Sequence, residues 1–155
     1  MGPDRLDLIE EFVTIGKSFI MAGGWNSFQG IKGIPGYHDT VIEEILPVEI
    51  KPYDDRVEKP QGVYPEIVEK KHPIFIDLPE QWPQFLGYNQ VILKENAHLL
   101  ARINNDPFIA TAAYGKGRTV AFTSDLSKHW GTAFIAWNGY AKFWCNTLHW
   151  LTGKS

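Results

Sequence analysis

A short apolar run that ends in a pair of glycines constrains the fold of this chain more than any other feature. The run covers residues 17–22 (KSFIMA), and the turn after it covers residues 23–30 (GGWNSFQG). In α/β proteins, an apolar strand followed at once by glycines places a site at the carboxyl end of a sheet strand. The sequence therefore predicts an α/β fold with a candidate site at Gly23 and Gly24.

This turn lacks the nucleophile that similar turns carry in many enzymes. Hydrolases place a Ser or Cys on a strained turn after a strand. Here the glycines are followed by Trp25 and Asn26, and the first hydroxyl is that of Ser27. A serine acts as a nucleophile only with a base beside it, and we expect Trp25 to occupy the elbow position. The alternative to a functional site at this turn is that the glycines only permit a tight chain reversal, and the two interpretations stay equally open here.

The composition is typical of one globular domain that does not bind nucleic acid. A length of 155 residues suits a single domain, which we extend over residues 1–155. The chain is 44% hydrophobic and carries a formal net charge of -3, which favours a folded protein and gives no electrostatic reason to expect nucleic acid. The sequence has neither a membrane-spanning apolar run nor the apolar core of a secretory signal. We therefore expect a cytoplasmic protein that does not bind a membrane.

Three segments are predicted to be helical. Apolar residues recur three or four positions apart over residues 4–15. A capping residue, Asp39 or Thr40, precedes a short helix that ends at Leu46, with Glu43 reaching back as in a capping box. The third helix spans residues 132–151 and carries Cys145, the one cysteine, which we expect to be a buried structural thiol. Its predicted buried stripe consists of Trp137, Ala141, Trp144, Leu148 and Leu151.

Further strands are predicted along the rest of the chain. The glycines of Gly115-Lys116-Gly117 join the last two strands in a hairpin. Residues 51–71 are polar and contain prolines, which indicates an excursion over the surface. The predicted strands cover residues 48–51, 87–94, 97–103, 107–114 and 118–123.

A second candidate site follows the last predicted strand, where Ser124, Asp125, His129 and Trp130 lie. A His and an Asp at the carboxyl end of a strand can orient one another and move protons. We expect this loop to face the glycine turn, so that both line one crevice. The alternative is structural: Ser124 or Asp125 caps a turn, while His129 and Trp130 pack beneath the closing helix.

The remaining histidines give weaker indications. His38 follows Tyr37 in the glycine-rich loop and is expected to line the same cleft. His72 precedes a proline and belongs to a turn. No two histidines have the spacing of a metal-binding pair, so we expect no tight metal site. The sequence likewise indicates no cofactor.

Several blocks of the chain, in one order, resemble the putative glutamine amidotransferase family. The blocks are GGWNSFQGIKG, YHDTVIEEILPVEI, HPIF, LGYNQV, YGKGRTVAFTSDLSKHWG and FIAWNGYAKFWCNTLHWL. This family has a flavodoxin-like fold related to class I glutamine amidotransferases. The resemblance therefore implies a three-layer α/β sandwich, here with an antiparallel hairpin extension.

The chain departs from the family pattern at the residues that carry the chemistry. Class I enzymes have Gly-x-Cys-x-Gly at the elbow and His-x-Glu after a later strand, and this chain has neither at the matching place. The first hypothesis is a non-catalytic amidotransferase-like domain that binds a small polar ligand or a partner protein. The residues expected to bind are Gly23, Gly24, Trp25, Asn26, Ser27, His38, Ser124, Asp125, His129 and Trp130.

The alternative is an active hydrolase or amidotransferase. It would use Ser27, or a residue outside this chain, as nucleophile, with His129 as base and Asp125 beside it. A hydrogen bond between Ser27 and His129 would favour this hypothesis.

The resemblance also implies that the chain is the C-terminal portion of the family's domain. The first strands of that domain would then be missing. A parallel strand such as residues 18–22 is normally buried between neighbours, and an unpaired edge recruits another chain. We therefore expect a homo-oligomer, or association with the missing N-terminal segment.

Overall fold

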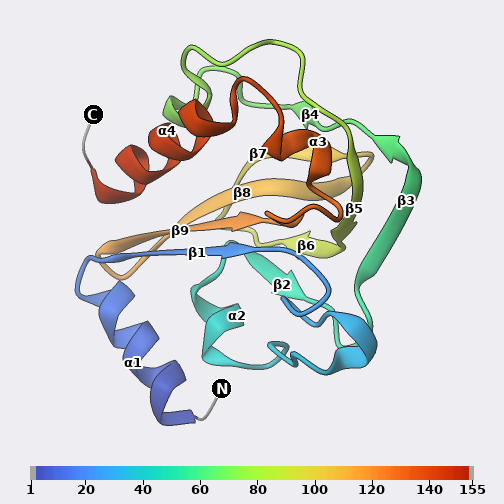
Figure 1. The fold of residues 1–155 in the computed structure, drawn as a ribbon. Helices are drawn as coiled ribbons and strands as arrows, with labels where there is room; N and C mark the ends of the chain where they lie inside the picture. Colours follow the sequence, from blue (N-terminus) through green and yellow to red (C-terminus); the bar gives the residue numbers. More distant parts are fainter. Residues whose placement is uncertain (1–2, 154–155) are drawn as a thin grey trace.

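The N-terminal helix leads directly into the first strand, as the sequence predicts. In the computed structural model, which describes residues 3–153, helix α1 spans Pro3–Thr14 and strand β1 spans Ser18–Ala22. Gly16 joins them with φ of 109°, a conformation that favours glycine. This short connection places α1 against the sheet to which β1 belongs (Figure 1).

A mixed five-stranded sheet forms the centre of the fold (Figure 1). β1 pairs in parallel with β9 (Gly117–Phe122), while the other neighbours pair antiparallel. The hairpin predicted around Gly115 and Gly117 is confirmed, because Tyr114 pairs with Gly117. The strand order is β1, β9 (Gly117–Phe122), β8 (Asp106–Tyr114), β7 (His98–Ile103) and β4 (Glu66–Ile67).

Two smaller antiparallel pairs correct two predictions. The strand predicted over residues 87–94 is two strands, β5 (Phe85–Asn89) and β6 (Val91–Leu93), which belong to different pairs and separate at Gln90. The polar segment 51–71 is more regular than expected, since it contains both β3 (Arg56–Val63) and β4. Its partners lie far along the chain: β3 pairs with β5, and β4 with β7. Strand β6 pairs with β2 (Val48–Ile50).

Core residues cover both faces of the large sheet. On β9, Val120 and Phe122 point into a cluster shared with helices α3 (Thr132–Ile135) and α4 (Tyr140–Thr152). Ala121 points to the opposite face, into a cluster with α1, α2 (Val41–Ile45), β2 and β6. This alternation is the period of two that a strand buried on both faces requires. Two short 3-10 helices, η1 (Ile31–Gly33) and η2 (Pro73–Phe75), complete the fold.

The prediction of one closing helix was wrong, because the chain breaks between α3 and α4. In this break Gly139 packs so closely on Trp137 that a Cβ would lie 2.4 Å from the ring. The buried positions of α4 are Phe143, Thr147 and Leu151, so the predicted burial of Leu151 is confirmed. Of the predicted stripe, Ala141 and Leu148 are exposed.

Cys145 is exposed on α4, so its predicted burial was also wrong. The buried face of α4 carries aromatic rings instead. Phe143 lies with its ring centroid 5.9 Å from that of Phe122 and 5.7 Å from that of Phe134. Across residues 3–153, no helix combines the length and the apolar character needed to cross a bilayer.

Candidate functional site

The two predicted loops meet at the carboxyl ends of β1 and β9 and enclose an open hollow of about 610 Å³. The rings of Trp25 and His129 face one another edge-on, with centroids 5.1 Å apart. This confirms that the loops share one crevice, and the parallel pairing of their strands explains it. The lining residues are Ala22, Gly23, Gly24, Trp25, Asn26, Ser27, Asp125, Leu126, Ser127 and His129.

A buried amide and a buried carboxylate hold the glycine loop in place. Asn89, at the end of β5, accepts the Gly24 N–H at 2.8 Å and donates to the Gly24 carbonyl at 3.2 Å. Its Nδ2 also donates to Asp55 Oδ1 at 2.8 Å. Asp55 in turn accepts the backbone N–H groups of Gln29 and Gly30, each at 2.9 Å. Both ends of the loop are thus fixed by residues from elsewhere in the chain.

Burial raises the pKa of the Asp55 carboxyl above its ordinary value, while the hydrogen bonds from Asn89, Gln29 and Gly30 act in the opposite direction. The carboxyl thus lies in a largely desolvated site, and the groups that face it are hydrogen-bond donors. This arrangement makes Asp55 a structural anchor of the loop.

Gly23 is required for its small size. A Cβ on it would lie 2.1 Å from the Thr123 carbonyl oxygen and 2.6 Å from Asn89 Oδ1. The next residue, Gly24, has φ of 139°, where a side chain is strained. The glycine pair therefore lets the loop approach the end of β9 closely, in addition to reversing the chain.

A second buried carboxylate, that of Asp125, organises the other loop. Its Oδ1 accepts the N–H groups of Ser127 at 3.3 Å and Gly131 at 2.8 Å, and its Oδ2 accepts that of Trp130 at 3.2 Å. Oδ2 also lies 3.0 Å from His129 Nδ1. This contact orients the imidazole through Nδ1, and the second ring nitrogen is Nε2. Asp125 therefore fulfils the structural prediction of a turn cap and also positions His129.

Trp25 is fixed from two sides by side chains of β3. Its Nε1 donates to Glu58 Oε1 at 2.9 Å, and the guanidinium carbon of Arg56 lies 4.8 Å from its ring centroid. The other oxygen of Glu58 accepts the indole N–H of Trp130, also at 2.9 Å. Although Trp25 remains 42% exposed, its ring has a defined position at the edge of the hollow.

The expected nucleophile and base are not hydrogen-bonded to one another. The Ser27 hydroxyl donates to the Ala22 carbonyl, and His129 Nδ1 is paired with Asp125. The thiol of Cys145 lies on α4 and is absent from the lining of the hollow. The arrangement contains an oriented histidine without an activated serine or cysteine beside it.

Three predicted site residues lie outside the lining of the hollow. Ser124 is fully buried and donates to the Gly87 carbonyl at 2.8 Å. Trp130 is buried against Gly87, where an added Cβ would lie only 2.3 Å from Trp130 Nε1. The structure places His38 beside Asp39 and Glu43 instead.

Sequence reasoning missed four residues that support the site: Asp55, Arg56, Glu58 and Asn89. Asn89 stands in the LGYNQV block, so the resemblance offered an indication of its importance. The other three lie in a segment that we expected to cross the surface. Nothing in their local sequence shows that their partners in the two loops lie far along the chain, as the separation of 25 residues between Gly30 and Asp55 illustrates.

These features define an α/β protein with a mixed sheet and a loop-lined hollow at the end of the parallel β1–β9 pair. The family model GATase1_like, described as "Putative glutamine amidotransferase", matches residues 1–153. The chain belongs to this family.

Solved structures agree with this assignment. Cytoplasmic Protein STM1381 from Salmonella typhimurium LT2 is 45% identical with a TM-score of 0.91, and the match covers 96% of this chain and 61% of that chain. Cytoplasmic Protein STM3548 from Salmonella typhimurium is 41% identical with a TM-score of 0.92, covering 97% and 61%. This chain therefore spans about three fifths of the length of these relatives.

A more distant structure shares the fold alone. It is a ThuA-like protein from Parabacteroides merdae, with 13% identity, a TM-score of 0.62, and coverage of 96% of this chain and 64% of that chain. A comparison with curated protein sequences finds no match.

Proposed function

We propose that this domain is a non-catalytic member of the amidotransferase-like family that binds a small polar ligand in the hollow between Gly23–Ser27 and Asp125–His129. The observation that carries the proposal is the arrangement of Trp25, Ser27 and His129 in the two loops that line the hollow. An exposed indole and an oriented imidazole are built into the hollow, whereas the Ser27 hydroxyl is bonded to the chain itself.

The rigidity of the hollow supports binding. Small-ligand sites combine an apolar surface with a few fixed polar groups. Trp25 supplies the apolar surface, and its position depends on Glu58 and Arg56 rather than on a ligand. His129 supplies a ring nitrogen that can donate or accept a hydrogen bond, depending on the tautomer. Since both loops are held by buried aspartates, a ligand would meet a preformed surface and would have little ordering to impose.

The binding test is a titration followed by NMR, with L-glutamine and L-glutamate as probes. We expect one of them to shift the Trp25 indole N–H and the His129 ring signals together, and the His129 shift to disappear in Trp25→Ala. His149→Gln is the matched control, because His149 is exposed on α4. Unchanged Trp25 and His129 signals with both probes would contradict the proposal for this ligand class.

The alternative of a working hydrolase keeps one favourable observation, the Asp125–His129 pair. A carboxylate that orients an imidazole is part of the serine hydrolase arrangement. It would require the Ser27 hydroxyl to leave the Ala22 carbonyl and turn toward His129. An esterase assay with p-nitrophenyl acetate distinguishes the alternatives, because hydrolysis lost in both Ser27→Ala and His129→Gln would favour the enzyme.

We propose in addition that the β1 edge associates with a second copy of the chain. Among the described residues β1 pairs with β9 alone, which leaves one strand edge for a further partner. Leu8 and Phe12 on the neighbouring helix α1, and Ile15 directly after it, are 64%, 51% and 61% exposed and recur four and three positions apart. An exposed apolar stripe beside an open strand edge is typical of an association surface.

Sedimentation tests this association at micromolar protein concentration. We expect dimers or larger species, and a shift toward monomer in Phe12→Glu. Tyr53→Glu serves as a control, because Tyr53 is 58% exposed and lies away from α1 and β1 in the sequence. A stable monomer of the unmodified chain would contradict the proposal.

Two further proposals concern the cellular location of the protein and the fold of the complete domain. We propose a cytoplasmic location, because both Salmonella relatives are named as cytoplasmic proteins. We also propose a flavodoxin-like sandwich for the complete family domain. The parallel β1–β9 pair and the core clusters on both sheet faces support it.

A further inference from the structure

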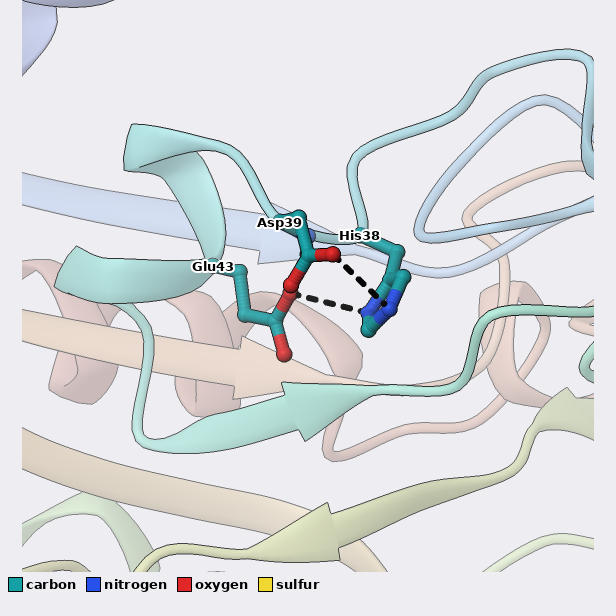
Figure 2. Close-up of side chains that lie close together, drawn as sticks. All are labelled: His38, Asp39 and Glu43. Atoms are coloured by element: carbon teal, nitrogen blue, oxygen red, sulfur yellow. Dashed lines mark hydrogen bonds and ion pairs between the residues drawn. The ribbon is translucent and has the colours of Figure 1, made fainter.

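We propose that His38, Asp39 and Glu43 bind a divalent transition-metal ion, with Zn²⁺ as the representative probe. The proposal concerns the far end of the glycine-rich loop and is independent of the hollow. One imidazole and two carboxylates are the kinds of ligand that zinc takes from proteins. Figure 2 shows the three side chains pointing toward one another at the start of α2.

The spacing of the ligand atoms fits a shared ion. His38 Nδ1 lies 3.2 Å from a Glu43 oxygen, while the 3.4 Å contact to an Asp39 oxygen is made by the other ring nitrogen, Nε2, so a single ion would use only one of these two nitrogens. One ligand atom from each residue can be chosen so that all three lie within 4.8 Å of one another. Zinc bonds of about 2.0–2.1 Å at tetrahedral angles separate two ligand atoms by about 3.3 Å. The observed His–Glu separation is close to this distance.

An independent observation concerns the Nδ1 atom of His38. It is buried and makes no hydrogen bond within the described residues, although a Glu43 oxygen lies 3.2 Å away. The two atoms are therefore close without the angles that a hydrogen bond requires. Two ligand atoms that both point at a shared ion, rather than at one another, are expected to lie close without these angles. Without an ion, a buried polar atom that has no partner costs free energy. A bound ion would provide the missing partner.

The supporting contacts hold Glu43 in a position suited to a ligand. Its Oε2 accepts the Asp39 N–H at 2.7 Å, which confirms that Glu43 reaches back before the helix, and its Oε1 accepts the Ile50 N–H at 2.8 Å. Metal-binding carboxylates are usually oriented by such outer hydrogen bonds. The Glu43 side chain is 14% exposed and that of Asp39 is 86% exposed, so the cluster is open on one side. Water can complete the coordination there.

The site would also connect to the loop that carries the hollow. The His38 N–H donates to Gln29 Oε1 at 3.2 Å, and the Gln29 N–H donates to Asp55. An ion at His38 would therefore stabilise the segment between the Asp55 anchor and α2. Sequence reasoning did not find this cluster, because it considered pairs of histidines and not one histidine with two carboxylates.

The experiment is a calorimetric titration of the full chain with ZnCl₂, with MgCl₂ as a control for simple charge attraction. We expect one Zn²⁺ per chain and no comparable Mg²⁺ binding, since magnesium prefers oxygen ligands alone. In His38→Gln the affinity should fall by roughly tenfold or more, because even outer partners of a metal ligand cost 10–100-fold. His38→Gln is the principal variant, because it keeps both backbone bonds of Glu43.

The matched control is His149→Gln, which removes a histidine that is exposed on α4 and should leave Zn²⁺ binding unchanged. A second readout is NMR of the histidine rings, where Zn²⁺ should move the His38 signals and leave those of His149 in place. Zn²⁺ binding that is equal in His38→Gln and the unmodified chain would overturn the proposal. So would a titration without stoichiometric uptake, which would show that the cluster is an ion pair only.

Discussion

Each of the two loops that form the hollow is organised by one buried aspartate, but the two aspartates come from different places in the sequence. Asp125 lies in the loop that it holds, and its partners follow within six residues. Asp55 lies 25 residues beyond Gly30 and reaches the glycine loop only through the fold. The same chemistry, a carboxylate that accepts backbone N–H groups, is thus local in one loop and long-range in the other.

This difference has a consequence for function. The carboxylate of Asp55 accepts hydrogen bonds from the loop and from Asn89, so its effect is on the shape of the hollow. Asp125 bonds to backbone groups and also to His129, whose ring lines the hollow. One aspartate therefore fixes the backbone of the hollow, while the other also positions a side chain that lines the hollow.

The largest expected effect is that of Asp55→Ala. It leaves the N–H groups of Gln29 and Gly30 and the amide of Asn89 without their buried acceptor. We expect the free energy of unfolding in urea to fall by about 3 kcal/mol. Asp54→Ala is the control, because the neighbouring Asp54 forms a partly exposed ion pair with Arg56, and its loss should cost about 1 kcal/mol or less. Equal losses in both variants would refute the long-range anchor.

A smaller loss is expected for Asp125→Asn. The amide keeps the shape and one acceptor oxygen, but it presents a donor to either the backbone N–H groups or His129. We expect a loss of about 2 kcal/mol in the same unfolding measurement. The ring signals of His129 should also change in NMR spectra, which Asp55→Ala should not cause directly. Asp77→Asn provides the control on an exposed aspartate, whose side chain is 79% exposed.

The smallest effect concerns pH. Because burial raises the folded-state pKa of Asp55, the native state binds more protons than the unfolded state above the ordinary Asp value of about 3.9. The contribution of Asp55 to stability is then complete below that value and declines as the pH rises through the folded-state pKa. The difference in unfolding free energy between the unmodified chain and Asp55→Asn should shrink from about pH 4 upward. A difference that grows with pH would mean that the three donors outweigh burial.

Much of the site was predictable because its main signals are local. The glycine turn, the hairpin at Gly115–Gly117 and the Asp125–His129 loop each lie within a short stretch of sequence. Parallel pairing of β1 with β9 then brings the two loops together, as expected from strand ends at one sheet edge.

The errors concern interactions over long separations. The anchors Asp55 and Glu58 act on residues that only the fold brings near them. The helical pattern continued through residues 136–139, where the chain breaks between α3 and α4 and Gly139 packs closely on Trp137. Likewise, β5 pairs with β3, whereas β6, which follows Gln90, pairs with β2. The alternation of apolar residues along this one segment does not reveal the change of partner.

The most direct test of the central claim is ammonia release from L-glutamine by the purified full chain. The claim is that the hollow holds an oriented histidine without an activated nucleophile. We predict no release above the buffer background, and the same result for Ser27→Ala and Cys145→Ser, because thioester chemistry needs an activated thiolate and Cys145 lies outside the hollow. Release by the unmodified chain that disappears in Ser27→Ala or in Cys145→Ser would contradict this account.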